Sequence, residues 1–217
     1  MCVYCGESSN TRDHVPSKVL LDPPYPPNTP VVSACEQCNN SYSVDEPYLA
    51  CLVDCVIRGG VQTCGGRARA KVVRILREKP HLAEHIERAR REDLFGPRWF
   101  PDMKRVLPIV LKLARGHIAY EFAEPRLDEP SQILIAPLES LTAYQLCRFE
   151  SPTEPGSVAV WPEVGSRAFL AACGADNRAS STAGWLIVQE GRYRYLALDE
   201  RTVRFVLSEY LACEVVW

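Results

Sequence analysis

The chain has 217 residues, a length that fits one large domain or two small ones. Hydrophobic residues make up 47% of the chain and charged residues 24%, which is ordinary for a soluble globular protein and excludes a chain too polar to form a core. The net charge of −2 hides an asymmetry: residues 67–115 carry 14 Lys and Arg against 6 Asp and Glu, and the rest of the chain carries 11 against 21. A basic face that meets a polyanion explains this distribution, and so does a solvated amphipathic helix.

The N-terminus has no basic segment followed by an apolar run, so we expect no secretory signal. The longest apolar stretches, such as residues 49–53, are too short for a membrane span. These features predict a cytoplasmic protein with no membrane contact. In that reducing compartment, the ten cysteines favour metal binding or free thiols over disulfides.

Two cysteine pairs with the same spacing stand near the start of the chain. Cys2 and Cys5 form the first pair, and Cys35 and Cys38 form the second. Each short turn directs two sulfurs toward a common point, so two such pairs can surround one Zn²⁺ with four thiolates. The 29 residues between the pairs exceed the ~15–20 of the simplest zinc motifs and leave room for an inserted hairpin. We predict a structural Zn²⁺ at these four cysteines.

The segment between the pairs predicts a hairpin. Val15 and residues 30–34 have the character of two short strands, and a proline-rich connection with a turn signal at Pro27 and Asn28 separates them. Residues 39–57 then predict one helix with an apolar stripe. The expected order is therefore strand, turn, strand, helix.

The segments CVYC, DHVP and VVSACEQCN, within residues 2–58, resemble the HNH endonuclease superfamily. In that superfamily a four-cysteine zinc often supports the ββα-metal finger. The resemblance is specific because the Asp-His-Val-Pro segment and the Cys-x-x-Cys-Asn segment occur together and in the family's order. It covers about a quarter of the chain.

The resemblance implies a metal-dependent endonuclease that hydrolyses phosphodiester bonds of DNA. His14 would be the general base that activates water, since a neutral imidazole can take a proton near pH 7. Asp13, on the opposite face of the same strand, and Asn39 would hold a catalytic Mg²⁺ or Mn²⁺. Such proteins often act in restriction or defence in bacteria and phage.

Two positions depart from the family pattern. Many members carry an asparagine that helps to orient the base; the corresponding position here is a proline, and Asn28 stands two residues earlier. Many members also have a lysine or histidine soon after the Cys-Asn pair, whereas here Asn40 follows and competes with Asn39 as the metal ligand. The contact to phosphate then falls to Lys18 or Arg12.

A basic stretch follows the expected finger. It begins in a glycine-rich loop and continues as a predicted helix, and we expect its cations to contact a nucleic-acid backbone without sequence preference. The candidate contact residues are Arg67, Arg69, Lys71, Arg74 and Arg77.

From about residue 118, short apolar or alternating runs divided by Pro, Gly and Ser predict β-strands, with a hairpin turn at Glu190 and Gly191. The runs cover residues 131–138, 157–161, 168–173, 184–198 and 202–217. A core position is favoured for five aromatic residues, Trp161, Trp185, Tyr193, Tyr195 and Trp217.

The predicted fold class is α+β. Residues 1–60 form an HNH-like ββα-metal finger with a four-cysteine zinc, residues 61–117 a basic helical segment, and residues 118–217 a mostly antiparallel β region of unknown role. A non-catalytic zinc-containing nucleic-acid-binding module is the first alternative, because it needs the cysteines and the basic stretch but neither Asp13 nor His14. A protein-interaction domain whose zinc only stabilises a small fold is the second. A homodimer and a protein activator are compatible with the sequence, which requires neither.

Overall fold

The structure is a computed structural model that describes residues 1–61, 68–94, 96–152, 160–174, 181–182 and 184–217. Helices combine with one six-stranded sheet and two two-stranded sheets in this part of the chain. The six-stranded sheet belongs to the C-terminal half, and all its strand pairs are antiparallel. The predicted mixture of helices with a mostly antiparallel C-terminal sheet is therefore confirmed.

The N-terminal unit, residues 1–44, is built around a small hairpin. Strand β1 (Thr11–His14) pairs with β2 (Val31–Ala34), and the 3-10 helix η1 (Lys18–Leu20) lies in the connection between them. Helix α1 (Glu36–Tyr42) follows directly. The order strand, strand, helix agrees with the order expected from the sequence, but Val15, which was predicted to lie in the first strand, comes directly after β1.

The expected single helix over residues 39–57 is two helices in the structure, α1 and α2 (Asp45–Arg58). Pro47 explains the break, because it has no N–H to donate to the carbonyl of residue 43, and proline is tolerated only in the first turn of a helix. Helix α2 ends at Arg58, and its C-cap Gly59 adopts the left-handed conformation (φ 81°) that closes many helices.

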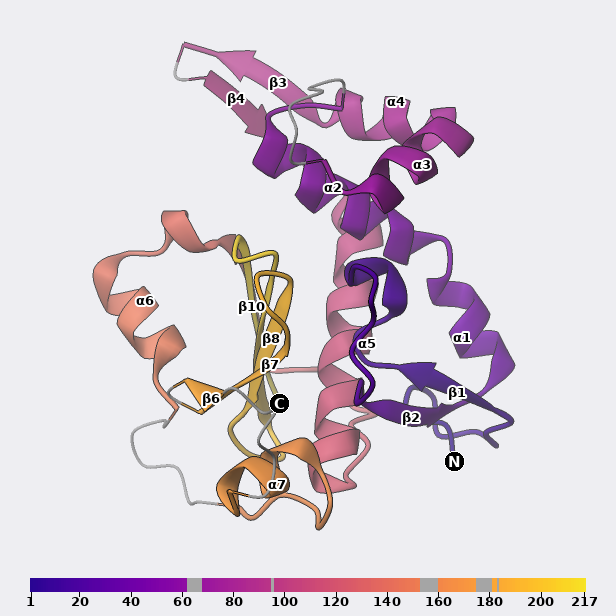
Figure 1. Ribbon diagram of the computed structural model, residues 1–217, viewed down its shortest axis with the longest axis vertical. Coiled ribbons are helices and arrows are strands. Elements are labelled where there is room, and N and C mark those ends of the chain that lie inside the picture. Colours follow the sequence, from indigo (N-terminus) through magenta and orange to yellow (C-terminus); the bar gives the residue numbers. More distant parts are fainter. Residues whose placement is uncertain (62–67, 95, 153–159, 175–180, 183) are drawn as a thin grey trace.

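The basic middle of the chain contains more than helices. Helices α3 (Ala70–Glu78) and α4 (Pro80–Arg88) are followed by a hairpin of β3 (Arg90–Asp93) and β4 (Gly96–Trp99). This hairpin, which was not predicted, projects from one end of the molecule (Figure 1).

Helix α5 (Met103–Phe122) lies between the N-terminal unit and the six-stranded sheet (Figure 1). The helix continues past residue 117, which was the predicted boundary between the basic helical segment and the β region. A methyl group at Gly116 would stand 2.6 Å from a methyl carbon of Val15, so glycine is what allows α5 to approach the end of β1 so closely.

No helix in the described part of the chain combines the length and apolar character that crossing a membrane requires.

The C-terminal sheet has the strand order β5-β10-β9-β8-β7-β6. Its strands are β5 (Gln132–Pro137), β6 (Ser181–Thr182), β7 (Trp185–Gln189), β8 (Tyr193–Ala197), β9 (Thr202–Leu207) and β10 (Leu211–Val216). The predicted turn at Glu190 and Gly191 joins β7 to β8. Alternate residues of β9 belong to two hydrophobic clusters, with Val203 and Phe205 on the side of α5 and Val206 on the other.

Two helices of this half differ from the strand prediction. Residues 168–173 were predicted as a strand, but Arg167–Ala172 form helix α7, whose first turn is capped by the Ser166 side chain. Helix α6 (Ala143–Glu150) was not predicted, and a short 3-10 helix, η2 (Leu138–Ser140), precedes it. Residues 157–159 of another predicted strand lie outside the described residues.

A buried arginine holds α6 against the outer face of the sheet. Arg204 of β9 donates from Nη1 to the carbonyl oxygens of Arg148 and Ser151 at the end of α6, and its Nε pairs with Glu214 of β10 at 2.5 Å. The carbonyls at a helix end need such donors when they are buried.

The predicted core aromatics are mostly buried. Trp185, Tyr193, Tyr195 and Trp217 lie inside, whereas Trp161 is exposed. One hydrophobic cluster extends from Cys2 in the N-terminal unit to Trp217 at the last position, so the two halves share a core across α5.

Candidate functional site

The four cysteines of the two pairs come together. Cys2 and Cys5 lie in the N-terminal turn, Cys35 is the N-cap of α1, and Cys38 is in its first turn. All four sulfurs lie within 4.8 Å of one another, and the Sγ atoms of Cys5 and Cys35 are 3.7 Å apart. With Zn–S bonds of about 2.3 Å, the sulfurs of a tetrahedral site stand about 3.8 Å apart.

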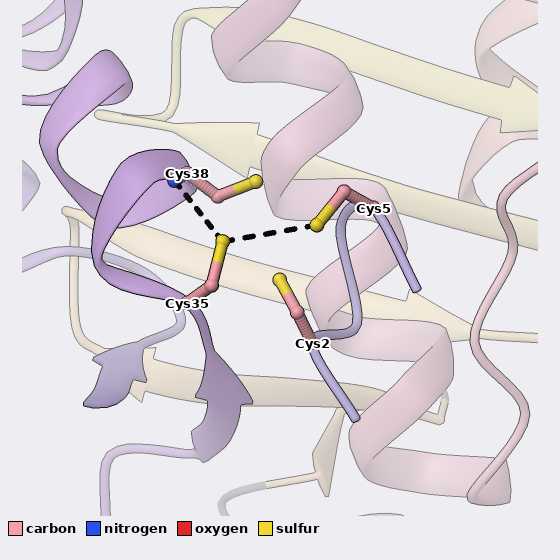
Figure 2. A group of neighbouring side chains, drawn as sticks. All are labelled: Cys2, Cys5, Cys35 and Cys38. Atoms are coloured by element: carbon pink, nitrogen blue, oxygen red, sulfur yellow. Dashed lines mark hydrogen bonds between the residues drawn. The ribbon is translucent and has the colours of Figure 1, made fainter. Parts of the chain in front are cut away.

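Figure 2 shows the four side chains directed toward a common centre. The backbone N–H of Cys38 donates to the Cys35 sulfur at 3.4 Å. This donor set can hold a metal ion and fits a structural Zn²⁺. Backbone hydrogen bonds from Val3 to Ser33 and from Asn10 to Ala34 tie the same N-terminal turn to β2, so a metal ion would join pieces that already touch.

His14 is the last residue of β1, opposite Val31, and its side chain is half-buried. Burial lowers the pKa of His14 below its ordinary value, the positive charge of Lys18 lowers it further, and the Asp13 carboxylate acts in the opposite direction. The imidazole is therefore mostly neutral at pH 7 and can accept a proton. The exposed Lys18, four residues later in η1, lies near enough for its charge to act on the ring.

Asp13 lies on the opposite face of β1 and is 6% exposed. Its Oδ2 atom accepts a hydrogen bond from the Tyr4 hydroxyl at 2.8 Å and pairs with the Lys112 ammonium at 2.7 Å. The same ammonium pairs with the carboxylate of Glu46 in α2. Burial, and then the Asp13 charge, raise the pKa of Tyr4, and burial raises the pKa of Glu46.

This arrangement does not offer Asp13 to a divalent ion. A metal ion at Oδ2 would stand beside the Lys112 ammonium, which repels it and which it would have to displace. Asn39, the other predicted ligand, lies half-buried in α1. Within the described residues, the four cysteines form the only group of three or more His, Cys, Asp or Glu side chains close enough to share an ion. A catalytic Mg²⁺ or Mn²⁺ therefore stays a prediction.

The remaining residues of the predicted centre are exposed. Asn28 lies in the turn between η1 and β2, and Arg12 is on the outer face of β1. The Asn40 carbonyl accepts a hydrogen bond from the Ser43 hydroxyl at the end of α1. The structure thus brings His14 and Lys18 together, and it ties Asp13 to the interior.

The predicted nucleic-acid contacts fall into two groups. Arg69 is buried, and its guanidinium donates to Asp22 and to the carbonyls of Val19 and Leu21, so it fastens α3 to the loop after η1. Lys71 is half-buried, Arg74 and Arg77 are exposed on α3, and Arg67 lies outside the described residues.

Sequence reasoning missed the side chains that surround Asp13, namely Tyr4, Glu46 and Lys112. One signal was present: Lys112 interrupts the apolar run of residues 106–114, where a charge is out of place unless it has a buried partner. Nothing local indicated which carboxylates would meet it.

In comparisons with known proteins, no family model, no curated protein and no solved structure matches this chain.

Proposed function

We propose that the chain hydrolyses phosphodiester bonds of nucleic acid, with DNA as the expected substrate and His14 as the general base. The observation that carries this proposal is the position of His14. His14 is the last residue of β1, in the β1–β2 hairpin that the four-cysteine cluster adjoins. Burial lowers the pKa of its imidazole, and the exposed Lys18 lies close enough for its charge to act on the ring. The resemblance of residues 2–58 to HNH endonucleases supports the same assignment.

In this mechanism a water molecule gives one proton to His14 while its oxygen attacks the phosphorus. The bond from phosphorus to the leaving oxygen breaks, and that oxygen takes a proton from solvent. Charge accumulates on the phosphoryl oxygens as water attacks, and we expect the ammonium of Lys18, whose charge acts on His14, to neutralise part of it. Burial of Asp13 with Lys112 keeps the strand beneath His14 in place.

The test is plasmid cleavage by the wild type and by His14→Ala, each with Mg²⁺, with Mn²⁺ and with EDTA. Loss of a general base costs about 10²–10⁴-fold in rate, so His14→Ala should lose cleavage by at least about 100-fold while its melting temperature stays near that of the wild type. His81→Ala, which removes an exposed histidine of α4, is the matched control and should cut normally.

The metal arms test the predicted Mg²⁺ or Mn²⁺ separately. Zinc content is measured in the EDTA arm, because a chelator can strip a structural zinc and unfold its domain. Cleavage that needs added metal, at constant zinc content, supports a catalytic ion but does not place it at Asp13, whose carboxylate is paired with Lys112. Cleavage that persists in EDTA removes that ion from the proposal and leaves His14 in place.

One observation favours a second candidate, a non-catalytic zinc-containing module that binds nucleic acid. The Asp13 carboxylate is already paired with Lys112, which is what a purely structural role for this residue requires. A wild type that binds the plasmid but does not cut it in any arm, with His14→Ala binding equally well, would establish this alternative.

A further inference from the structure

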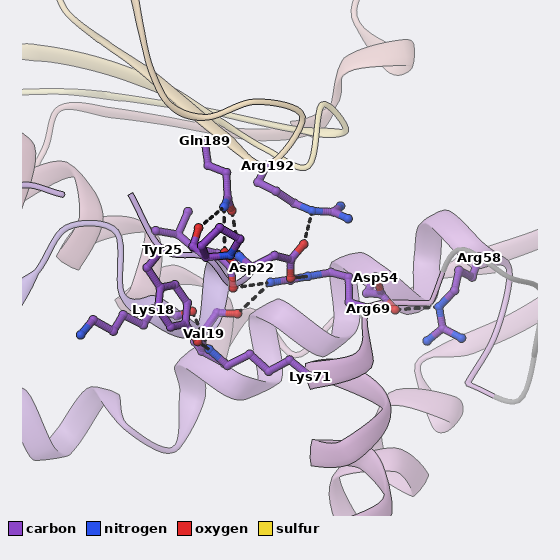
Figure 3. Close-up of polar contacts among 12 residues, drawn as sticks. Lys18, Val19, Asp22, Tyr25, Asp54, Arg58, Arg69, Lys71, Gln189 and Arg192 are labelled. Carbon is purple, nitrogen blue, oxygen red and sulfur yellow. Dashed lines mark hydrogen bonds and ion pairs between the residues drawn. The ribbon is translucent and has the colours of Figure 1, made fainter. Parts of the chain in front are cut away.

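A basic cavity of about 650 Å³ opens where three segments meet: the loop after η1, the start of α3, and the turn between β7 and β8. Pockets for small ligands are about 300–1,000 Å³, so this volume admits a molecule of nucleotide size. The charged and aromatic side chains in its lining are Asp22, Tyr25, Arg69, Lys71, Arg74 and Arg192. Figure 3 shows five of these side chains, Asp22, Tyr25, Arg69, Lys71 and Arg192.

The charge of this cavity is strongly positive. Four cations face one carboxylate, so the formal charge of the lining is +3. Asp22 lies between Arg69, whose Nε is 2.7 Å from Oδ1, and Arg192, whose Nε is 2.5 Å from Oδ2. The carboxylate thereby orients two guanidinium groups that come from distant parts of the chain, and Arg192 uses its Nε for this pair.

A second wall combines a lysine with a tyrosine. Lys71 donates to the Tyr25 hydroxyl at 2.8 Å and to the Lys18 carbonyl at 2.6 Å, which holds the Tyr25 ring beside the first turn of α3. Tyr25 is 37% exposed, and the ammonium groups of Lys18 and Lys71 lie 5.8 Å and 5.0 Å from the centre of its ring. An exposed aromatic ring beside cations is the combination on which nucleobases stack while their phosphates are neutralised. Among the described residues no side chain forms a capping hydrogen bond at Arg69, the N-cap of α3, and the helix dipole adds to the positive potential there.

The cavity also adjoins the His14 region. The positive charge of Lys18 acts on His14. The Lys18 carbonyl accepts a hydrogen bond from the Lys71 ammonium, and the Lys18 ammonium lies 5.8 Å from the centre of the Tyr25 ring. Residues 14–25 therefore run from the candidate catalytic histidine to the wall of the cavity.

We propose that this cavity binds a nucleotide through its phosphate, with the base on Tyr25, either as a free nucleotide or as one unit of a strand. Its role in placing a strand for cleavage rests on the proposed function of His14. The binding itself does not depend on cleavage. Of the side chains involved, Asp22, Tyr25 and Arg192 are not among the contacts predicted from the sequence.

The experiment measures fluorescence anisotropy of a labelled twelve-residue oligothymidylate with the full chain, in buffer without added divalent ions. Arg74→Gln and Arg192→Gln each remove one cation of the lining, one from α3 and one from the β7–β8 turn. Lys104→Gln removes one positive charge from an exposed position at the start of α5, outside the lining, and is the matched control. Zinc content and melting temperature confirm that each variant is folded.

Each lining variant loses a charge-assisted hydrogen bond to phosphate and should raise Kd by about tenfold or more, and the control should raise it by no more than about twofold. Unlabelled thymidine monophosphate should compete, and thymidine should not. Direct binding of the monophosphate, measured by calorimetry, without any binding of the oligonucleotide assigns the site to free nucleotides, and binding of both assigns it to strands as well.

Equal affinity in all three variants would overturn the proposal. So would a loss confined to Arg74→Gln, which would place binding on the surface of α3, and equal competition by thymidine, which would exclude phosphate recognition. The expected binding pattern in a protein that cuts no plasmid keeps the cavity and rejects the nuclease. Normal plasmid cleavage together with equal oligonucleotide affinities in all variants keeps the nuclease and rejects the cavity as a binding site.

Discussion

The N-terminal unit and the C-terminal sheet pack on opposite sides of α5, and they are stabilised by different means (Figure 1). The N-terminal unit has two strands of four residues each, and a two-stranded hairpin alone is marginally stable. Two further features stabilise this unit: the four-cysteine cluster, and the buried ion pair that joins Asp13 to Lys112 of α5. The sheet has six strands with apolar side chains on both faces, and its own buried ion pair, Arg204 with Glu214, joins two of its strands.

Helix α5 meets the two regions with different chemistry. Toward the N-terminal unit it presents the charged Lys112, which is 1% exposed. Toward the sheet it presents His117, whose ring stacks on Tyr195 with centroids 3.8 Å apart and whose Nε2 is 2.8 Å from the Tyr193 hydroxyl. Burial lowers the pKa of His117 well below its ordinary value, with the Arg167 charge acting in the same direction. The contact of α5 with the N-terminal unit therefore depends on the charge of Lys112, and its contact with the sheet depends on a neutral His117.

The largest effect is expected from removing the metal site. Cys35→Ala should abolish zinc binding and unfold the N-terminal unit, because apparent binding energies of structural zinc are about 10–16 kcal/mol and much of that stabilises the fold. Zinc analysis and thermal unfolding provide the measurement, and the melting temperature should fall by at least about 10 °C. Cys147→Ala changes an exposed cysteine of α6 and should leave both quantities unchanged. A Cys35→Ala protein with normal zinc content would show that the four-thiolate site is wrong.

The next effect breaks the charged contact of α5. Lys112→Met leaves the carboxylates of Asp13 and Glu46 buried beside each other without a cation, which costs about 3–5 kcal/mol. Urea unfolding measures this loss. Adding Asp13→Asn should recover part of it, because one of the two unpaired charges is removed. Strictly additive losses would mean that the pair does not act as a unit.

The same variant tests whether Lys112 keeps a divalent ion away from Asp13. In Lys112→Met the Asp13 and Glu46 carboxylates are released from their ammonium, so Mg²⁺ should raise the melting temperature of this variant more than that of the wild type. Equal shifts in the two proteins would show that Lys112 does not keep an ion away from Asp13.

The contact of α5 with the sheet should respond to pH. An unfolded histidine takes up a proton near pH 6.5, whereas His117 stays neutral in the fold until much lower pH. The unfolded chain therefore binds more protons, and stability falls as pH drops below about 6.5, by up to about 1.4 kcal/mol per pH unit. His14 acts in the same direction, and the raised pKa of Glu121 acts against it.

A comparison of slopes isolates the part that belongs to His117. His117→Gln should be less stable near pH 7.5 because the ring stacking is lost, but its free energy of unfolding should fall less steeply toward pH 5.5 than that of the wild type. Parallel pH profiles of the two proteins would assign the acid sensitivity to other groups.

The smallest effect is expected away from both contacts. Arg88 and Glu84 of α4 pair at 2.6 Å with their side chains 73% and 58% exposed. Such a pair is screened by solvent, so Arg88→Ala should change the free energy of unfolding by no more than about 0.5 kcal/mol. A larger loss in urea unfolding would mean that surface charge, and not only the buried Lys112, stabilises this half of the chain.

Local patterns predicted much of the fold. The repeated cysteine spacing indicated the cluster, and the alternation in residues 184–198 indicated β7, β8 and their turn, because both features depend on neighbours in the sequence. Helix α6 could have been found from Thr142 and Gln145, which form a capping box. Helix α7 could not be separated from a strand, since a short apolar run fits either.

Local sequence patterns were therefore enough to predict the cysteine cluster and the strand-strand-helix order, and the assignment of His14 as a general base stays a prediction. The tertiary structure alone decided that Asp13 pairs with Lys112 and that Asp22 meets Arg192, 170 residues further along the chain. The physical reason is distance along the chain. A cation in an apolar helix must find a buried partner, but which carboxylate it meets depends on how α5 packs between the two regions, and no local pattern encodes that packing.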